Sequence, residues 1–147
     1  MKTLTRLWVE GTAVAGTLDL LSAFVFSGSK GIGPVRVLQS VASGPLGHRA
    51  LEVPALAIAG LITHYAIMSV MVAVFLVAAL RLPFLTRRPV VSGMVYGFGL
   101  WIVMYWIVLP LRFAGFQTPH ELLPIAKQLF SHCFCVGLPI AYIARKR

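Results

Sequence analysis

Three ionisable side chains lie near the middle of three different apolar segments of this chain. Asp19 follows the start of the first segment by about twelve residues, His64 lies about eleven residues into the second, and His132 lies about twelve residues from the end of the fourth. At the helical rise of about 1.5 Å per residue, each position is close to the centre of a bilayer. A charged group at that depth costs a few kcal/mol, so it faces protein or water and not lipid. The spacing therefore predicts one polar layer inside a helix bundle.

Such a layer is suited to proton transfer or to cation binding. Imidazole exchanges protons near neutral pH, and an Asp–His pair would change its protonation as a proton or cation passes. His64, His132 and Cys135 are candidate ligands for a transition metal, and two axial histidines would ligate haem. The residue types also allow a structural role, in which the three side chains hold the helices together.

No further chemistry is indicated by motif. The chain contains no His-Glu-x-x-His spacing, no nucleophile elbow and no phosphate-binding loop. No catalytic residue is identified, and we expect no resident cofactor. Arg36 and Gln39 lie between the first two apolar segments and are further candidate ligands for a substrate or ion. Arg36 is long enough either to reach lipid headgroups or to extend down toward Asp19.

The composition requires a membrane around these groups. Of the 147 residues, 59% are hydrophobic and only 12% are charged, which is about half the charged share of a soluble domain. A soluble domain of this length has too little interior to hide so much apolar surface. The length allows one domain, residues 1–147.

The hydropathy pattern predicts an all-α integral membrane protein, a bundle of four transmembrane helices. The first is not read as a cleaved signal peptide, because Glu10 and Asp19 interrupt it and no convincing cleavage site follows. The fourth is expected to begin at a capping box, Thr118 to Glu121, and Pro124 and Pro139 are possible kinks within it. The predicted spans are residues 7–27, 53–80, 89–111 and 119–144.

A short helix is predicted between the first two spans, at about residues 34–43. Pro34 opens it and Gly44 closes it. It is too short to cross a bilayer, so it is expected to be interfacial or re-entrant. Its polar face is expected to contain Arg36, Gln39, Ser40 and Ser43. Small residues four apart, at Gly11 and Ala15 and at Gly93 and Gly97, predict close helix packing.

The basic residues indicate orientation and not nucleic-acid binding. The net charge is +9, but Lys and Arg flank the apolar segments and form no basic–aromatic face. With the N-terminus inside, eight of them lie on the inner side and five on the outer side. This imbalance predicts cytoplasmic N- and C-termini.

Several short motifs resemble the YagU type of small bacterial inner-membrane proteins, a poorly characterised family. The likeness is best over roughly the last 90 residues. It is carried by Thr63-His64, Leu109-Pro110-Leu111, Leu129-Phe130-Ser131-His132, the glycine-rich start Gly11–Gly16 and the segment Arg36–Gly44. This chain departs from that family in its compact outer loop and the lack of a long C-terminal tail. The resemblance implies an inner-membrane location and identifies no activity.

Three functions follow from these observations. The first is a small proton-, ion- or metal-linked transporter or channel-like protein that uses the Asp–His layer. The second is a non-catalytic accessory or scaffold subunit, favoured by the small size and the small-residue faces. The third is a haem- or quinone-linked redox protein, which rests on the histidine pair alone. The expected partners are the lipid bilayer and either further copies of the chain or a larger membrane complex.

Overall fold

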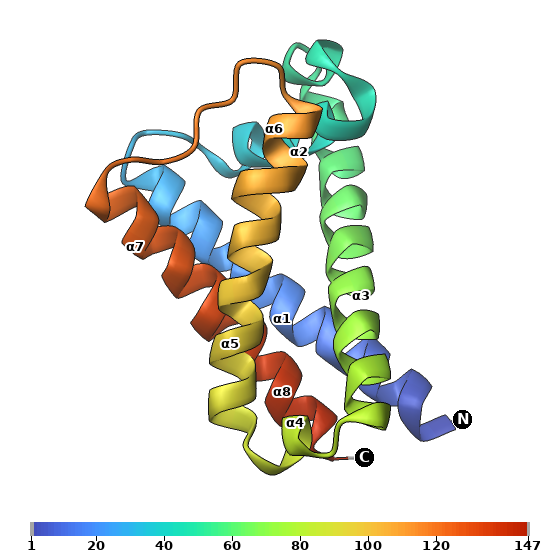
Figure 1. Ribbon diagram of the computed structural model, residues 1–147. Coiled ribbons are helices and arrows are strands. Elements are labelled where there is room, and N and C mark those ends of the chain that lie inside the picture. Colours follow the sequence, from blue (N-terminus) through green and yellow to red (C-terminus); the bar gives the residue numbers. More distant parts are fainter. Residues whose placement is uncertain (1, 147) are drawn as a thin grey trace.

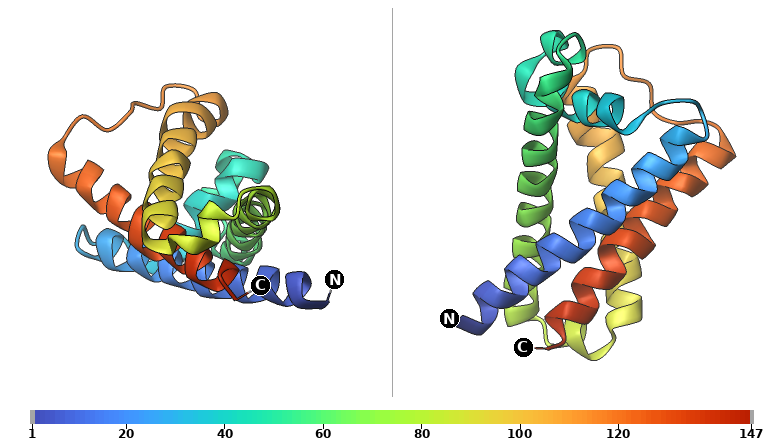
Figure 2. Two further views of the ribbon diagram at one scale, coloured as in Figure 1. Left: turned by 60° about the horizontal axis from the view of Figure 1, so that its bottom comes forward. Right: turned by 180° about the vertical axis from the view of Figure 1, so that it is seen from behind.

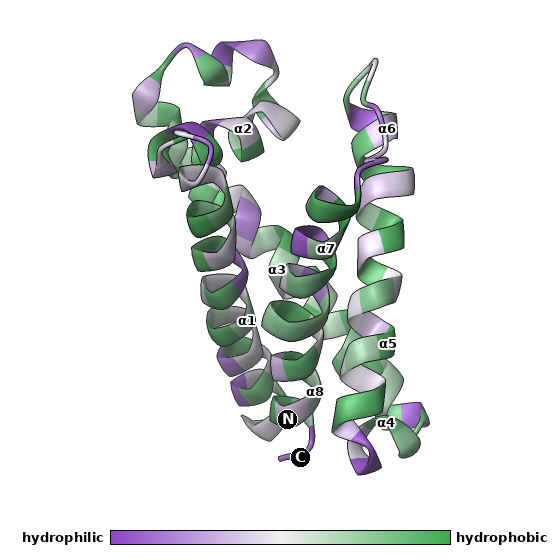
Figure 3. Ribbon diagram, turned by 90° about the vertical axis from the view of Figure 1, so that its left-hand side faces the viewer, coloured by the Kyte–Doolittle hydropathy of each residue, from purple (hydrophilic) through white to green (hydrophobic). Residues whose placement is uncertain are grey.

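The computed structural model describes residues 2–146 and is a bundle of helices (Figure 1). Within those residues there is no strand. Figure 3 shows that the long helices are mostly apolar and that strongly polar residues collect toward the ends of the bundle. The predicted all-α fold with four membrane-spanning helices is confirmed. The helical segments long and apolar enough to cross a membrane are Thr3–Gly28, Pro54–Arg81, Pro89–Arg112 and Leu122–Ala144.

Each span is built from one or more helical elements. The first is the single helix α1 (Lys2–Gly28), and the second joins the 3₁₀ turn η2 (Pro54–Leu56) to α3 (Ala57–Arg81). The third contains α5 (Pro89–Ile102), the π-helical η3 (Val103–Val108) and α6 (Leu109–Arg112). The fourth contains α7 (Leu122–Phe130), the π-helical η4 (Ser131–Gly137) and α8 (Leu138–Ala144). The connections contain α2 (Pro34–Leu46), the 3₁₀ turn η1 (His48–Leu51) and the short helix α4 (Phe84–Arg87).

The two ends of the bundle differ. The chain begins and finishes at the end where α4 lies, and α2 lies at the opposite end, as Figure 1 and both views of Figure 2 show. We call these the termini end and the α2 end. The basic residues separate between the two ends as the sequence predicts, because Arg81, Arg87 and Arg88 lie beside α4 while Arg36 and Arg112 lie at the α2 end.

Each π-helical segment comes directly before a proline. Pro110 follows η3 and Pro139 follows η4, both within the first two residues of the next α-helix. A proline within a helix lacks an N–H and its ring clashes with the carbonyl four residues earlier. A wider turn before the proline relieves that clash while the helix continues. The predicted disturbance at Pro139 is therefore a π-helical turn, whereas Pro124 lies in the first turn of α7.

The predicted start of the fourth span is wrong. Thr118, Pro119 and His120 are not helical, and α7 begins at Leu122. Glu121 precedes it in an extended conformation (φ −86°, ψ 140°) and no side chain caps the helix. The capping box does not form, because its glutamate lies before the first turn and not inside it.

The short helix α2 is longer than predicted. It continues through Gly44 and Pro45 to Leu46, and the stop is Gly47, whose φ of 72° suits a glycine. The N–H of Gly47 donates to the carbonyl of Ser43. The expected polar face is not uniformly exposed, since Gln39 and Ser43 are buried while Arg36 and Ser40 are exposed.

The apolar core fills the half of the bundle nearest the termini, where α1, α3, η4 and α8 meet. Its largest fully buried side chains are Phe75, Ile140, Val72 and Val136. Glycines bring the helices close, as the small-residue spacing predicts. A Cβ on Gly11 would lie 2.9 Å from Val72 Cγ1, and one on Gly97 would lie 2.6 Å from the Cα of Cys133.

Candidate functional site

His64 is held against α1 by a backbone hydrogen bond. Its Nε2 lies 2.8 Å from the carbonyl oxygen of Gly16, and its side chain is buried. A carbonyl oxygen only accepts, so Nε2 carries the hydrogen and Nδ1 is the unprotonated nitrogen of the neutral ring. The approach depends on Gly16, because a Cβ there would lie 2.7 Å from Tyr65 Cε1.

His132 is oriented the opposite way. Its Nδ1 lies 2.9 Å from the carbonyl oxygen of Gln128, one turn earlier, and its side chain is half-buried. The same argument makes Nδ1 the donor and leaves Nε2 as the free nitrogen of the neutral ring. The side chain of Gln128 is itself fixed, because its Oε1 accepts a hydrogen bond of 3.1 Å from Trp101 Nε1.

Asp19 lies on α1, which packs against both α3 and η4, the elements that carry the two histidines. Its carboxylate is half-buried, and both imidazoles, of His132 and His64, are close enough to act on it electrostatically. In the part of the chain that the structure describes, the ion pairs are His48–Glu52 and Lys146–Glu10, and neither involves Asp19. No side chain among residues 2–146 donates a hydrogen bond to its carboxylate. Asp19 is thus within electrostatic range of both histidines, without a direct Asp–His contact.

Residues from the two π-helical segments complete the cluster. The Tyr105 ring, on η3, meets the His132 ring edge-to-face, with 5.9 Å between centroids. Asp19 acts electrostatically on the hydroxyl of Tyr105 and on the thiol of Cys135, on η4. Ser22 Oγ donates to the Asp19 carbonyl (2.8 Å) and lies 2.6 Å from Ser131 Oγ. We call Asp19, His64, His132, Tyr105 and Cys135 the central cluster.

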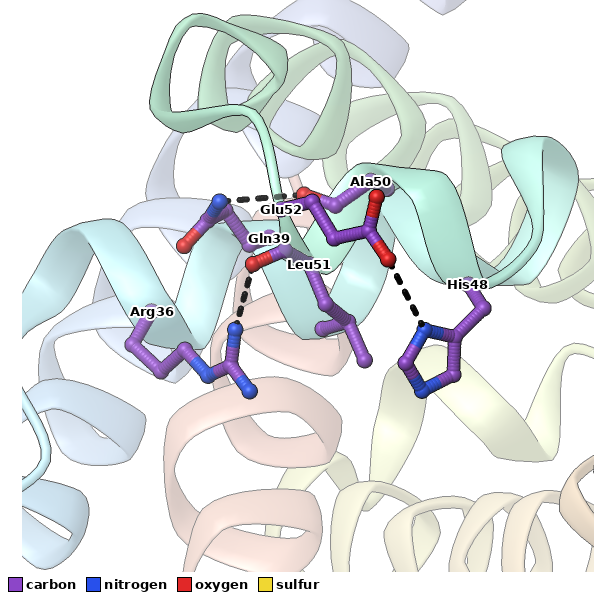
Figure 4. Close-up of polar contacts among 6 residues, drawn as sticks. All are labelled: Arg36, Gln39, His48, Ala50, Leu51 and Glu52. Atoms are coloured by element: carbon purple, nitrogen blue, oxygen red, sulfur yellow. Dashed lines mark hydrogen bonds and ion pairs between the residues drawn. The ribbon is translucent and has the colours of Figure 1, made fainter.

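Arg36 and Gln39 lie apart from this cluster. Figure 4 shows both side chains directed at the turn that follows α2. Arg36 Nη1 donates to the Leu51 carbonyl (2.6 Å), and Gln39 Nε2 donates to the Ala50 carbonyl (3.0 Å). The idea that Arg36 extends to Asp19 is therefore wrong, because its guanidinium is used to hold the connection between α2 and η1.

The metal candidates do not form a site of three ligands. Across residues 2–146, no group of three or more His, Cys, Asp or Glu side chains is arranged to hold a metal ion. His64, His132 and Cys135 share an electrostatic environment through Asp19 without converging on one point.

Sequence reasoning missed Tyr105 and the pair Trp101–Gln128. The aromatic residues of the third span look like packing residues or an interfacial belt. Tyr105 lies in the wide turn of η3, which changes the direction in which side chains point. The prolines at positions 110 and 139 are the sequence signal for the wide turns of η3 and η4.

No family model, no curated protein and no solved structure matches this chain. The class of protein is defined by the fold: a multi-pass membrane protein with four spanning helices and an ionisable cluster within them.

Proposed function

We propose that the protein conducts protons across its membrane, with Asp19 as the central carrier and His64 and His132 as its exchange partners. The carrying observation is that the Asp19 carboxylate has no hydrogen bond or ion pair to any side chain of residues 2–146 while two imidazoles act on it. Each imidazole keeps one free ring nitrogen when neutral, because the other donates to a carbonyl.

The lack of a direct partner argues against a structural ion pair at Asp19. A carboxylate that only held helices together would be expected to have a direct partner, because an unpaired charge in a membrane interior costs several kcal/mol. Asp19 instead has two imidazoles within electrostatic range and no side chain bonded to its carboxylate. That arrangement suits a group that gains and loses a proton through water or through small side-chain movements.

Two buried hydroxyls support a path from the cluster toward the termini end. Thr12 Oγ1 and Ser92 Oγ are buried and have no hydrogen-bond partner among the described residues. Thr12 precedes Asp19 on α1 by about two helical turns, or about 10 Å. Buried polar atoms of this kind are commonly satisfied by internal water, which would relay protons past the apolar core.

The location belongs to the same proposal. The excess of Lys and Arg at the termini end favours cytoplasmic termini. A bacterial inner membrane is what the resemblance to YagU-type proteins implies. Both are consistent with a proton path that runs from the α2 end to the cytoplasm.

The test is proton flux in liposomes. Purified protein is reconstituted into potassium-loaded vesicles containing a pH-sensitive dye, and valinomycin imposes a membrane potential. Asp19→Asn keeps the side-chain shape but cannot ionise, so we expect flux to fall by about a hundredfold, the lower range for a positioned acid–base group. His132→Gln is expected to lower flux as well.

His120→Gln is the matched control, because His120 is exposed and lies outside the helices. It should conduct like the unmodified protein. Equal flux in Asp19→Asn and the control would overturn the proposal. No flux in the unmodified protein, with loss of thermal stability in Asp19→Asn, would favour the accessory-subunit function. An absorbance spectrum of the same preparation tests the haem- or quinone-linked alternative.

A further inference from the structure

α2 packs against α3 at the end of the bundle opposite the termini, one turn away from His64. Gly60 lies on α3 one turn before His64, and a Cβ at Gly60 would collide with the Leu38 carbonyl of α2. The backbone of α2 therefore lies directly against α3 at the level just above the histidine. Figure 2 shows α2 crossing this end between α3 and α6.

α2 and the turn after it form one unit. Arg36 and Gln39 of α2 donate hydrogen bonds to the carbonyls of Leu51 and Ala50. These bonds are drawn in Figure 4. The unit, residues 34–52, is preceded by a glycine-rich connection in which Gly31 has a φ of 77°. A helix joined to its neighbour through such glycines can change direction there with little steric cost.

Besides the packing of α2 against α3, Arg112 makes side-chain hydrogen bonds between this unit and a spanning helix. Arg112, at the end of α6, donates from Nε to the Gly44 carbonyl and from Nη2 to the Ser43 carbonyl (3.2 Å). Within residues 2–146, no other side chain makes a hydrogen bond between the unit and a spanning helix. Arg112 is exposed, so its bonds to the two carbonyls exchange readily with water.

The same residue is connected to the cluster. Arg112 follows η3 by one short helix, and η3 carries Tyr105, whose ring meets that of His132. A change in the wide turn of η3 would move Arg112 relative to Ser43 and Gly44. The position of the α2 unit and the state of the cluster are thereby linked through one helix.

We propose that the α2 unit is a gate that closes the central cluster toward the α2 end, with Arg112 as its latch. This proposal rests on the proposed proton conduction and adds its regulation. Release of the latch lets the unit swing on its glycine connection and admits water to His64. The structure described here is the closed state of that gate.

Arg112→Gln removes the charge and the paired donors while keeping a polar side chain. The measurements are proton flux in liposomes and hydrogen–deuterium exchange of residues 34–46 in nanodiscs. We expect both the flux and the exchange of these amides to rise by about tenfold, which corresponds to about 1.4 kcal/mol in the closed–open equilibrium. Arg112→Lys keeps the charge but has a single donor nitrogen, so its flux and exchange should lie between those of Arg112→Gln and of the unmodified protein. If Arg112→Gln folds poorly, Arg112→Lys tests the same proposal.

Arg49→Gln is the control, because Arg49 is an exposed arginine of the same unit. It should match the unmodified protein in both measurements. If Asp19→Asn abolishes flux but Arg112→Gln leaves it unchanged, the gate is wrong and proton conduction stands. If the unmodified protein conducts no protons, both proposals fail together. Faster exchange with unchanged flux also overturns the gate.

Discussion

His64 and His132 use opposite ring nitrogens to bond to the backbone. His64 donates from Nε2 and His132 from Nδ1, each to a backbone carbonyl on a rigid helix. Because a carbonyl never donates, the backbone selects the tautomer of each neutral ring. The free nitrogens, Nδ1 of His64 and Nε2 of His132, are then the positions at which a proton is accepted.

Nitrogen NMR tests this assignment directly. In protein with ¹⁵N-labelled histidine, at a pH where both rings are neutral, we expect His64 as the Nε2–H tautomer and His132 as the Nδ1–H tautomer. Protonated and bare ring nitrogens have well-separated shifts, and the variants His64→Gln and His132→Gln assign the signals. Finding both residues in one tautomer would contradict the hydrogen bonds to Gly16 and Gln128.

The sequence predicts how deep a residue lies in the membrane better than it predicts which groups its side chain touches. The depth of Asp19, His64 and His132 follows from counting residues along apolar segments, and both imidazoles act electrostatically on Asp19. What each side chain touches depends on helix rotation and on the irregular turns η3 and η4, which residue spacing does not specify. For the same reason Arg36, a charge on a predicted polar face, binds a nearby carbonyl instead of Asp19.

The third and fourth spans pack through backbone contacts between α5 and η4. A Cβ on Gly93 would lie 2.8 Å from the carbonyl oxygen of Gly137, and one on Gly97 would collide with the carbonyl of His132. These contacts set the distance between the helices that carry Tyr105 and His132. The small-residue spacing predicts such a seam, and only the structure identifies its partner as the π-helical η4.

Gly97→Ala is expected to destabilise the fold. The added methyl group meets backbone atoms that cannot move aside, so the free energy of unfolding should fall by about 1–3 kcal/mol, as in overpacked cores. Gly99→Ala is the matched control on the same helix, because no atom lies within 4 Å of its Cβ position. It should be neutral or stabilising by up to about 1 kcal/mol. Denaturant titration in mixed micelles measures both, and equal values would show that the seam is loose.

The sequence predicts that a helix is present better than it predicts where the helix ends. The four spans follow from apolar length, since about 20 residues are needed to cross a bilayer. The ends depend on local competition: two glycines, Gly44 and Gly47, compete to stop α2, and Thr118 and Glu121 resemble a cap that does not form. In the structure, α2 stops at Gly47, and residues 118–120 are not helical.

The whole molecule is arranged in three levels along the bundle axis. The apolar core around Phe75 and Ile140 fills the half nearest the termini, the central cluster lies beyond it, and α2 packs against α3 at the far end. At the termini end, Lys146 Nζ pairs with Glu10 and so ties the end of the chain to α1. This order of levels is the one that the proposed proton conduction with a gate would use.

Orientation is the last property to test at this scale. The sequence predicts eight Lys and Arg residues on the side of the termini and five on the other side, and the positive-inside rule then predicts cytoplasmic termini. A green fluorescent protein fused after residue 84 or at the C-terminus should fluoresce, and alkaline phosphatase inserted near residue 46 should be active, because it requires disulfides that form outside. Replacing Arg81, Arg87 and Arg88 by Gln leaves five charges at each end, so this variant should insert in both orientations. An active phosphatase at the C-terminus of the unmodified protein would reverse the assignment, and the gate formed by α2 would then face the cytoplasm.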